Sequence, residues 1–264
     1  MPSDASATGD QPGLGEELVR LASADNFRDV TGVETTYPAG VGLLQRGVLY
    51  RSNELQLTDD DAHSIAGLGI TAVYDLRSQH EVEAHPDVEV PGAEWHHLEV
   101  HGIPMDSVRD LDTRDAGTEV MREVYRSFVD EPGARAAFAE LFNRIALSEG
   151  AQLFHCTAGK DRTGWASVLL LHLAGVDDQL ILQDYLLTNT FSSGTREKYL
   201  GMVREHLGED KVEVYERVMV ADESYLQTAY DAVTASYGSR DGYLRGGLGL
   251  TDDVLVRLRS LLVE

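Results

Sequence analysis

Cysteine is almost absent from this sequence, since the 264 residues contain only one, Cys156. A single cysteine excludes an intramolecular disulfide and fits a reducing compartment. Positive charge is also scarce: 45 acidic residues outnumber 22 basic ones and give a net charge of −23. Because this excess of negative charge repels nucleic acid and anionic membrane surfaces, we expect no nucleic-acid partner.

Long apolar runs are missing as well. The longest strongly apolar stretch, around 168–173, is interrupted by His172 and is far shorter than the ~20 residues that span a bilayer. Residues 1–15 lack the basic start and the apolar run of a signal peptide, and we expect them to form a disordered tail. We therefore expect no stable membrane insertion, and a protein that is cytoplasmic or secreted without a recognisable signal peptide.

Strand-like and helix-like segments alternate over the first two-thirds of the chain. Short β-rich runs at 47–51 and 70–75 enclose a helix start at Thr58, and residues 94–99 alternate as a strand. This order predicts the α/β class, with a central, mainly parallel sheet flanked by helices. We expect a single domain over 16–264, because the length is only slightly above the usual single-domain range.

Most of the remaining chain is predicted to be helical. The polar stretch 106–118 is the exception, and we expect a loop there. Helices are expected to start at Pro132, Arg162, Asp177 and Thr251, with Gly175 ending the second of them. The helical residues 190–237 exceed what a minimal three-layer domain needs, so we expect a helical lid within them.

The apolar run 152–154 leads directly into Cys156. We interpret it as a buried strand that delivers a loop at its carboxyl end, the edge where open α/β sheets bind ligands. A loop between a strand and a helix N-terminus directs backbone N–H groups and the helix dipole at the sulfur. Such settings lower a cysteine pKa from ~8.5 to roughly 3.5–7.5. Cys156 is therefore predicted to be a thiolate nucleophile.

The same loop suits a phosphate group. Its N–H donors can cradle the oxygens, and Arg162, six residues after Cys156, can return a guanidinium fork to two of them. Gly159 allows close backbone approach, Thr163 can donate its hydroxyl to the regenerated thiolate, and Lys160 can add charge at the rim. We therefore predict that Cys156 and Arg162 are catalytic, and that the substrate is bound by Thr157, Ala158, Gly159, Lys160 and Thr163.

The segment from His155 to Gly164, HCTAGKDRTG, resembles the phosphate loop of the protein-tyrosine-phosphatase superfamily. Further stretches are similar to the bacterial tyrosine phosphatase group, namely NFRD at 26–29, YRS at 50–52, DLRS at 75–78, DYLLTN at 184–189 and YGS at 237–239. The resemblance covers most of the chain from about Asn26. It implies the cysteine-phosphatase fold with a helical lid, and activity toward phosphotyrosine that extends to phosphoserine, phosphothreonine and phosphoinositides.

A general acid is needed to protonate the leaving group, and three aspartates compete for this role. Asp161 lies inside the loop, and the order Asp-Arg-Thr resembles that of lipid phosphatases that use a loop aspartate. Asp75 ends a predicted strand at the same sheet edge, and Asp130 lies upstream. The sequence has no Trp-Pro-Asp segment to decide among them, and we favour Asp161 over Asp75.

Several residues are predicted to support the loop. His155 is expected to order it by hydrogen bonding. Arg28, Arg51 and Arg77 could ring the pocket or pair with neighbouring aspartates as structural glue, and the sequence leaves both possibilities open. His96, His97 and His101 lack the companion ligands of a zinc site, so we predict no metal, and no cofactor.

Together these features predict a cysteine-dependent phosphomonoester hydrolase that forms a phosphocysteine intermediate. Its partners would be a phosphorylated protein or a phosphoinositide, with inorganic phosphate as the product. The alternative is a phosphoinositide or inositol-phosphate phosphatase with little protein substrate, because a lysine at the place of Lys160 is also a feature of phosphoinositide phosphatases. A phosphate-binding module without catalysis is disfavoured, because nucleophile, arginine and candidate acid are all present.

Overall fold

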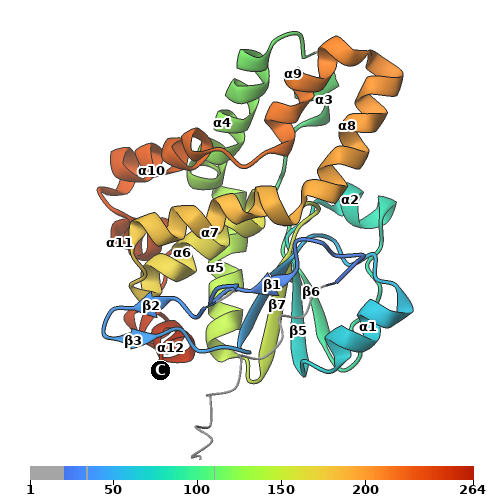
Figure 1. The fold of residues 1–264 in the computed structure, drawn as a ribbon. Coiled ribbons are helices and arrows are strands. Elements are labelled where there is room, and N and C mark those ends of the chain that lie inside the picture. Colours follow the sequence, from blue (N-terminus) through green and yellow to red (C-terminus); the bar gives the residue numbers. More distant parts are fainter. Residues whose placement is uncertain (1–20, 34, 110) are drawn as a thin grey trace, which may run out of the picture.

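The computed structural model describes residues 21–33, 35–109 and 111–264, so the predicted tail at 1–15 lies outside the described residues. The central sheet has five strands in the order β1-β4-β7-β5-β6 (Figure 1). Their bounds are Arg28–Asp29, Leu49–Ser52, Ala151–His155, Ile70–Asp75 and Glu94–His97. β4, β7, β5 and β6 are parallel, whereas the short edge strand β1 is antiparallel to β4. The predicted α/β class with a mainly parallel sheet is confirmed.

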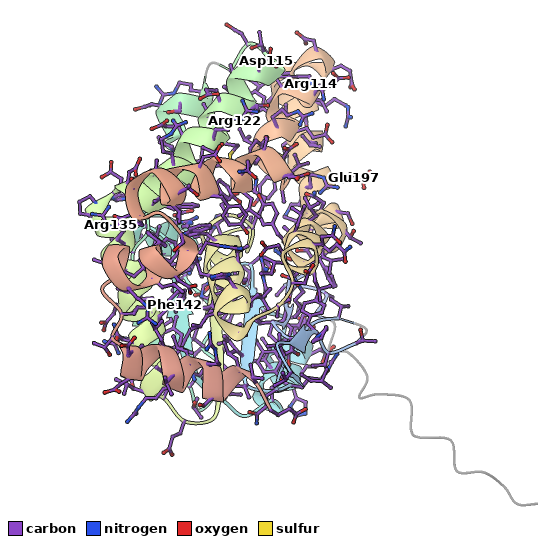
Figure 2. The ribbon with its side chains drawn as sticks, turned by 90° about the vertical axis from the view of Figure 1, so that its left-hand side faces the viewer. Arg114, Asp115, Arg122, Arg135, Phe142 and Glu197 are labelled. Atoms are coloured by element: carbon purple, nitrogen blue, oxygen red, sulfur yellow. The ribbon has the colours of Figure 1, made fainter. Side chains whose placement is uncertain are left out.

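Side chains of the strands alternate between two cores, one on each face of the sheet. Leu153 of β7 shares the smaller core with Ile65 of α1 (Asp59–Ala66). The next residue, Phe154, belongs to the larger core on the opposite face, together with Phe142 of α5 (Pro132–Leu147), which Figure 2 labels. The sheet is therefore flanked by helices on both faces, as a buried parallel sheet requires.

The other elements follow in chain order around this frame. They are β2 (Pro38–Ala39), β3 (Gly42–Leu43), α2 (Gln79–Ala84), α3 (Met105–Arg109), α4 (Arg114–Asp130), α6 (Arg162–Ala174), α7 (Asp178–Phe191), α8 (Ser193–Leu207), α9 (Glu209–Met219), α10 (Glu223–Tyr237), α11 (Arg240–Gly242), the π-helical turn η1 (Tyr243–Gly247) and α12 (Asp252–Leu262). None of the described helices is long and apolar enough to cross a bilayer.

Helix ends lie where the capping residues predict them. Thr58 and Thr251 each accept a hydrogen bond from the backbone of the first turn, of α1 and α12 respectively. Pro132 stands in the first turn of α5, where its missing N–H costs nothing. Gly175 ends α6 in the left-handed conformation, with φ of 87°. These four predictions are confirmed.

The stretch 106–118 is largely helical, and its prediction as a loop is wrong. It holds most of α3 and the first turn of α4, whose N-terminus is capped by the side chain of Thr113. Gly117 of α4 lies so close to α9 that a Cβ atom on it would stand 3.0 Å from the carbonyl oxygen of Val214. Lys211 of α9 donates to the backbone carbonyl of Leu111 (2.8 Å). Contacts with α9, distant in sequence, thus stabilise helices that the local composition does not signal.

Helices α8, α9 and α10 occupy the region 190–237, where a lid is expected. α10 is part of the main body, because Tyr225, Leu226, Ala229 and Val233 are buried and the helix packs on α4. α8, in contrast, has no buried side chain. It packs against α9, and the pair stands beside the upper half of α4 (Figure 1). We refer to residues 193–219 as the α8–α9 hairpin.

Candidate active site

The cysteine loop follows β7, the strand between β4 and β5. Ser52 and Asp75 are in register with His155, so the three parallel strands end together where the loop begins. The loop runs into α6, which starts at Arg162. Cys156 is only 1% exposed. The loop therefore lies at the carboxyl edge of the sheet and at a helix N-terminus, where backbone N–H groups and the helix dipole favour an anion.

Three consecutive carbonyl groups of the loop are bound by donors from outside it. These pairs are Thr157 O with Glu54 N–H (3.0 Å), Ala158 O with Asn26 Nδ2 (2.9 Å) and Gly159 O with Arg51 Nη2 (2.9 Å). No peptide bond in the described ranges is cis, so each N–H points away from the carbonyl of its own peptide unit. The N–H groups of residues 158–160 are consequently directed into the loop, where they can bind an anion.

Gly159 is the one position of this loop at which a side chain is excluded. Its φ is +63°, in the left-handed region, and an added Cβ atom would stand 2.5 Å from the carbonyl oxygen of Ser52. Any other residue would be strained and would also collide with β4. Glycine therefore lets the loop pack directly on the end of the neighbouring strand.

Arg162 is held by a carboxylate from α2. Its Nη1 and Nη2 atoms each lie 2.7 Å from one oxygen of Glu81, and Nη1 also donates to Val100 O (3.1 Å). Burial raises the pKa of Glu81, but the hydrogen bonds and charge of Arg162 outweigh it and hold that pKa well below its usual range. Glu81 also accepts the hydroxyl of Thr157 (2.5 Å) and forms the capping box of α2 with Ser78. The plane of the guanidinium is thereby fixed.

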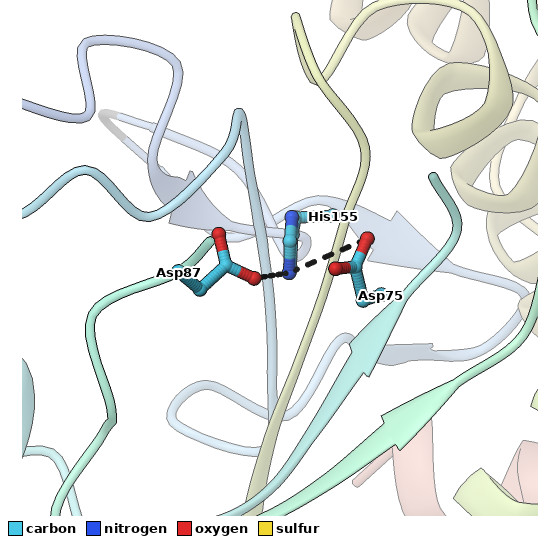
Figure 3. A group of neighbouring side chains, drawn as sticks. All are labelled: Asp75, Asp87 and His155. Atoms are coloured by element: carbon cyan, nitrogen blue, oxygen red, sulfur yellow. Dashed lines mark ion pairs between the residues drawn. The ribbon is translucent and has the colours of Figure 1, made fainter. Parts of the chain in front are cut away.

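His155 belongs to a buried ionic network at the base of the loop (Figure 3). Its Nε2 lies 3.1 Å from Asp87 Oδ2 and 3.9 Å from Asp75 Oδ1. Burial lowers the pKa of His155, yet the carboxylates of Asp87 and Asp75 raise it above its ordinary value. The stabilisation from protonated His155 is therefore complete below the ordinary pKa of about 6.5 and is lost as the pH rises through the raised pKa.

The same network contains ligand types that can bind a metal. Asp75, Asp87 and His155 offer atoms within 4.8 Å of one another. Arg77, however, already places Nη2 at 2.7 Å from Asp75 and 2.8 Å from Asp87, so its positive charge occupies the place that a cation would take. The other histidines do not gather: His96, His97 and His101 contact Arg144, the Arg77 carbonyl and Glu99, respectively. The network therefore fits a support for the loop better than a metal centre.

Asp161 faces a pair of buried tyrosines. Tyr125 of α4 donates to its Oδ1 (3.1 Å), and the hydroxyls of Tyr125 and Tyr185 are 2.7 Å apart. Burial and neighbouring charge raise the pKa of both tyrosines well above the ordinary value, which keeps them protonated as donors. The Asp161 side chain is 13% exposed, whereas Asp75 is fully buried against Arg77. Of these two carboxyl groups, Asp161 is the more accessible.

Lys160 points away from the rim where we expected it. Its Nζ donates to the backbone carbonyls of Val218 (2.6 Å) and Val220 (3.2 Å), at the end of α9, and lies 3.6 Å from Asp161 Oδ1. Burial lowers its pKa, and the charge of Asp161 opposes this. Asn189 of α7 holds the same connection through two 2.8 Å hydrogen bonds to the backbone of Ala221. The loop and the connection from α9 to α10 are thus joined directly.

Comparison with known proteins gives a consistent result. The family model described as "Tyrosine phosphatase family" matches residues 19–264. The chain belongs to the tyrosine phosphatase family. It is 29% identical to the triple specificity protein phosphatase PtpB of Mycobacterium tuberculosis, over 92% of this chain and 98% of the relative. It is also 33% identical to a putative tyrosine-protein phosphatase of Cupriavidus necator, over 89% and 85%, and 30% identical to a tyrosine-protein phosphatase of Nostoc commune, over 77% and 70%.

The predicted site residues of this phosphatase fall into three groups. The loop and the start of α6 bring together Cys156, Thr157, Ala158, Gly159, Lys160, Asp161, Arg162 and Thr163. The buried Thr163 hydroxyl has no hydrogen-bond partner within the described chain, which leaves it available to the sulfur. Asp75, Arg77 and His155 lie in the ionic network, and Arg28 of β1 lies in another buried cluster with Asn26 and Asp184. Arg28, Arg51 and Arg77, considered as rim or glue, are all buried and each lies beside an aspartate.

Three residues at the site of this tyrosine phosphatase were not anticipated from the sequence. Glu81 carries a usable signal, because Ser78 and Glu81 have the spacing of a capping box directly after the strand that ends at Asp75. Asp87 and Tyr125 carry none, since they reach His155 and Asp161 only after distant segments have packed together.

Proposed function

We propose that this tyrosine phosphatase hydrolyses phosphate monoesters through Cys156. The thiolate attacks phosphorus, the bond from phosphorus to the leaving oxygen breaks, and a phosphocysteine forms. Water then attacks the phosphocysteine, the sulfur–phosphorus bond breaks, and inorganic phosphate leaves. The observation that carries this proposal is the outward binding of three loop carbonyls, which directs the N–H groups of residues 158–160 into the loop that begins at Cys156.

Two side chains complete the binding of phosphate in this mechanism. Arg162, whose Nη1 and Nη2 are aligned by Glu81, offers its Nε–H and the remaining Nη2–H to phosphate oxygens and stabilises the charge that develops on them. Thr163 donates its unpaired hydroxyl to the sulfur when phosphocysteine is hydrolysed, so that the leaving thiolate is stabilised.

Asp161 is our proposed general acid. It protonates the leaving oxygen in the first step and takes a proton from the attacking water in the second. Its position next to Arg162 and its partial exposure support this role, and Tyr125 restricts its rotation through the hydrogen bond to Oδ1. Asp75 is a weaker candidate because both of its oxygens are bound by Arg77.

We propose phosphotyrosine as the main substrate, with phosphoserine, phosphothreonine and phosphoinositides as further substrates. The relative named triple specificity phosphatase supports breadth of this kind. We also propose that the α8–α9 hairpin is a lid over the site, since α8 has no buried side chain and the end of α9 binds Lys160. The alternative is an inositide phosphatase with little protein substrate. In that case Lys160 would bind a substrate phosphate after leaving the carbonyls of Val218 and Val220.

One assay series tests the proposed function. We expect hydrolysis of p-nitrophenyl phosphate that vanadate inhibits, and a phosphorylated Cys156 that acid quenching and mass spectrometry detect. Phosphotyrosine, phosphoserine and phosphothreonine peptides and phosphoinositides are then compared at matched concentration. Turnover confined to phosphoinositides would establish the alternative, and the absence of vanadate-sensitive turnover on every substrate would refute both.

Replacing Asp161 by asparagine tests the general acid. We expect kcat/KM for phosphotyrosine peptides to fall by about 10²–10⁴-fold, because the basic phenolate then leaves without a proton. The loss should be much smaller for p-nitrophenyl phosphate, whose leaving group needs little protonation. Asp130→Asn, at the exposed end of α4, is the matched control and should leave kcat/KM for both substrates unchanged. Equal losses on the two substrates would exclude Asp161 as the acid.

A further inference from the structure

The side chains of Arg51 and Asn26 each bind one carbonyl group of the loop. Each of these two side chains is also held by a second partner. Arg51 donates from Nη2 to Gly159 O (2.9 Å) and from Nη1 to Asp184 Oδ2 (3.0 Å). Asn26 donates from Nδ2 to Ala158 O (2.9 Å), and its Oδ1 accepts a hydrogen bond from Arg28. Because each side chain is bound at both ends, its donor cannot turn away from the loop.

Arg28 joins these two arms into one cluster. Its Nη2 donates to Asp184 O (3.3 Å) and Thr188 Oγ1 (3.4 Å), and its Nε lies 3.7 Å from Asp184 Oδ1. The guanidinium also stands 5.1 Å from the centre of the Phe191 ring, which accommodates its charge. Asn26, Arg28, Arg51 and Asp184 are all at most 1% exposed. The cluster therefore ties the N-terminal segment, β4 and α7 together beneath the loop.

The cluster carries more positive than negative charge. Arg28 and Arg51 share the single carboxylate of Asp184, so one cation is left without a counter-charge within the cluster. Burial and the charge of Arg51 lower the pKa of Arg28 to about 9, while Asp184 opposes this. A buried cation without a counter-charge costs free energy, and an anion bound in the loop would offset part of that cost.

We propose that Asn26 and Arg51 are positioning residues for phosphate binding. Together with Arg28 and Asp184 they hold the carbonyls of Ala158 and Gly159 outward, which aims the N–H groups of Gly159 and Lys160 at the bound phosphate. Neither residue touches the substrate. The inference rests on the proposed function, because it takes the Cys156 loop as the phosphate site.

Inorganic phosphate is the probe that tests this role. Its Kd is measured by titration calorimetry in Cys156→Ser protein, alone and with Arg51→Lys or Asn26→Ala added. Lysine keeps the charge of Arg51 but lacks the fork that joins Asp184 to Gly159 O, and alanine removes the donor to Ala158 O. We expect each change to raise the Kd on the order of tenfold, which corresponds to the loss of about one well-placed hydrogen bond. In protein with an intact Cys156, each change should raise KM and lower kcat.

Tyr37→Phe is the matched control. Tyr37 donates to Asp184 Oδ1 (3.2 Å) but does not contact the loop, so its loss should lower the unfolding midpoint and leave the phosphate Kd unchanged. A Kd within about twofold of the parent in Asn26→Ala, or an equal rise in Tyr37→Phe, overturns the proposal. If Arg51→Lys does not fold, Asn26→Ala decides. Absence of turnover in the wild type would refute the proposed function instead, since the Kd comparison needs no catalysis.

Discussion

Replacing Cys156 by serine is expected to abolish turnover while phosphate binding survives. Serine has nearly the same shape as cysteine, but its hydroxyl is not ionised at neutral pH and is a far weaker nucleophile at phosphorus. By analogy with other enzymes that lose their nucleophile, we expect kcat to fall on the order of 10⁴–10⁶-fold. The N–H groups of residues 158–160 and the Arg162 fork remain, so the Kd for inorganic phosphate should change little.

Two measurements distinguish the loss of the nucleophile from misfolding of the variant. Cys156 is buried in the main core cluster, so the unfolding midpoint of Cys156→Ser must be compared with that of the wild type. Quenched reactions should also show that the 32P-labelled phosphocysteine is lost. Turnover within about tenfold of the wild type in a folded Cys156→Ser protein would show that another group attacks phosphorus.

The second large effect is expected from Arg162→Lys. The lysine keeps a positive charge, but it replaces a planar fork by a point charge and cannot hold Glu81 and a phosphate group in one plane. We expect kcat/KM to fall by about 10²–10³-fold, the usual effect of removing one donor that stabilises a developing oxyanion. Arg126→Lys is the matched control: this arginine pairs with Glu123 on the exposed face of α4, and its loss should change little.

Glu81→Gln shows whether the arginine acts through its carboxylate partner. The amide keeps the shape of Glu81 but removes the charge that aligns the guanidinium, so activity should fall. In the Arg162→Lys background the same change should have little further effect, because the geometry that Glu81 maintains is already lost. Fully additive losses, or near wild-type activity of Arg162→Lys, would mean that the Glu81–Arg162 pair is not part of phosphate recognition.

The strand, the loop and the helix at the centre of the candidate site could be predicted from the sequence because they are neighbours along the chain. The run 152–154, the loop from Cys156 and the helix from Arg162 form one strand–loop–helix unit whose geometry depends on local rules. The alternation of strands with helices and the cap positions follow from similar short-range patterns, such as the threonines before α1 and α12. The α/β class and the cysteine loop could therefore be predicted without a structure, whereas the order of the strands in the sheet could not.

Features that depend on distant contacts were beyond such reasoning. Lys160 could not be assigned a direction from the loop sequence, because its carbonyl partners Val218 and Val220 come from the end of α9. Asp87 reaches His155 from the chain that follows α2. The error at 106–118 has the same origin, since its helices pack against α9, about 100 residues later. In each case the missing information was which segments meet in space.

The capping box of α2 limits how the chain can vary in length. Turns between strands and helices normally tolerate insertions and deletions, since they lie at the surface and carry few fixed contacts. Between β5 and α2 the spacing is constrained, because Glu81, three residues after Ser78 in the capping box, must also reach Arg162. Adding or deleting one residue between Asp75 and Ser78 would leave the capping box intact but would turn and shift α2 relative to the sheet, so that the carboxylate no longer meets the guanidinium. This turn should therefore keep a constant length wherever the Glu81–Arg162 pair is retained, even if its other side chains change.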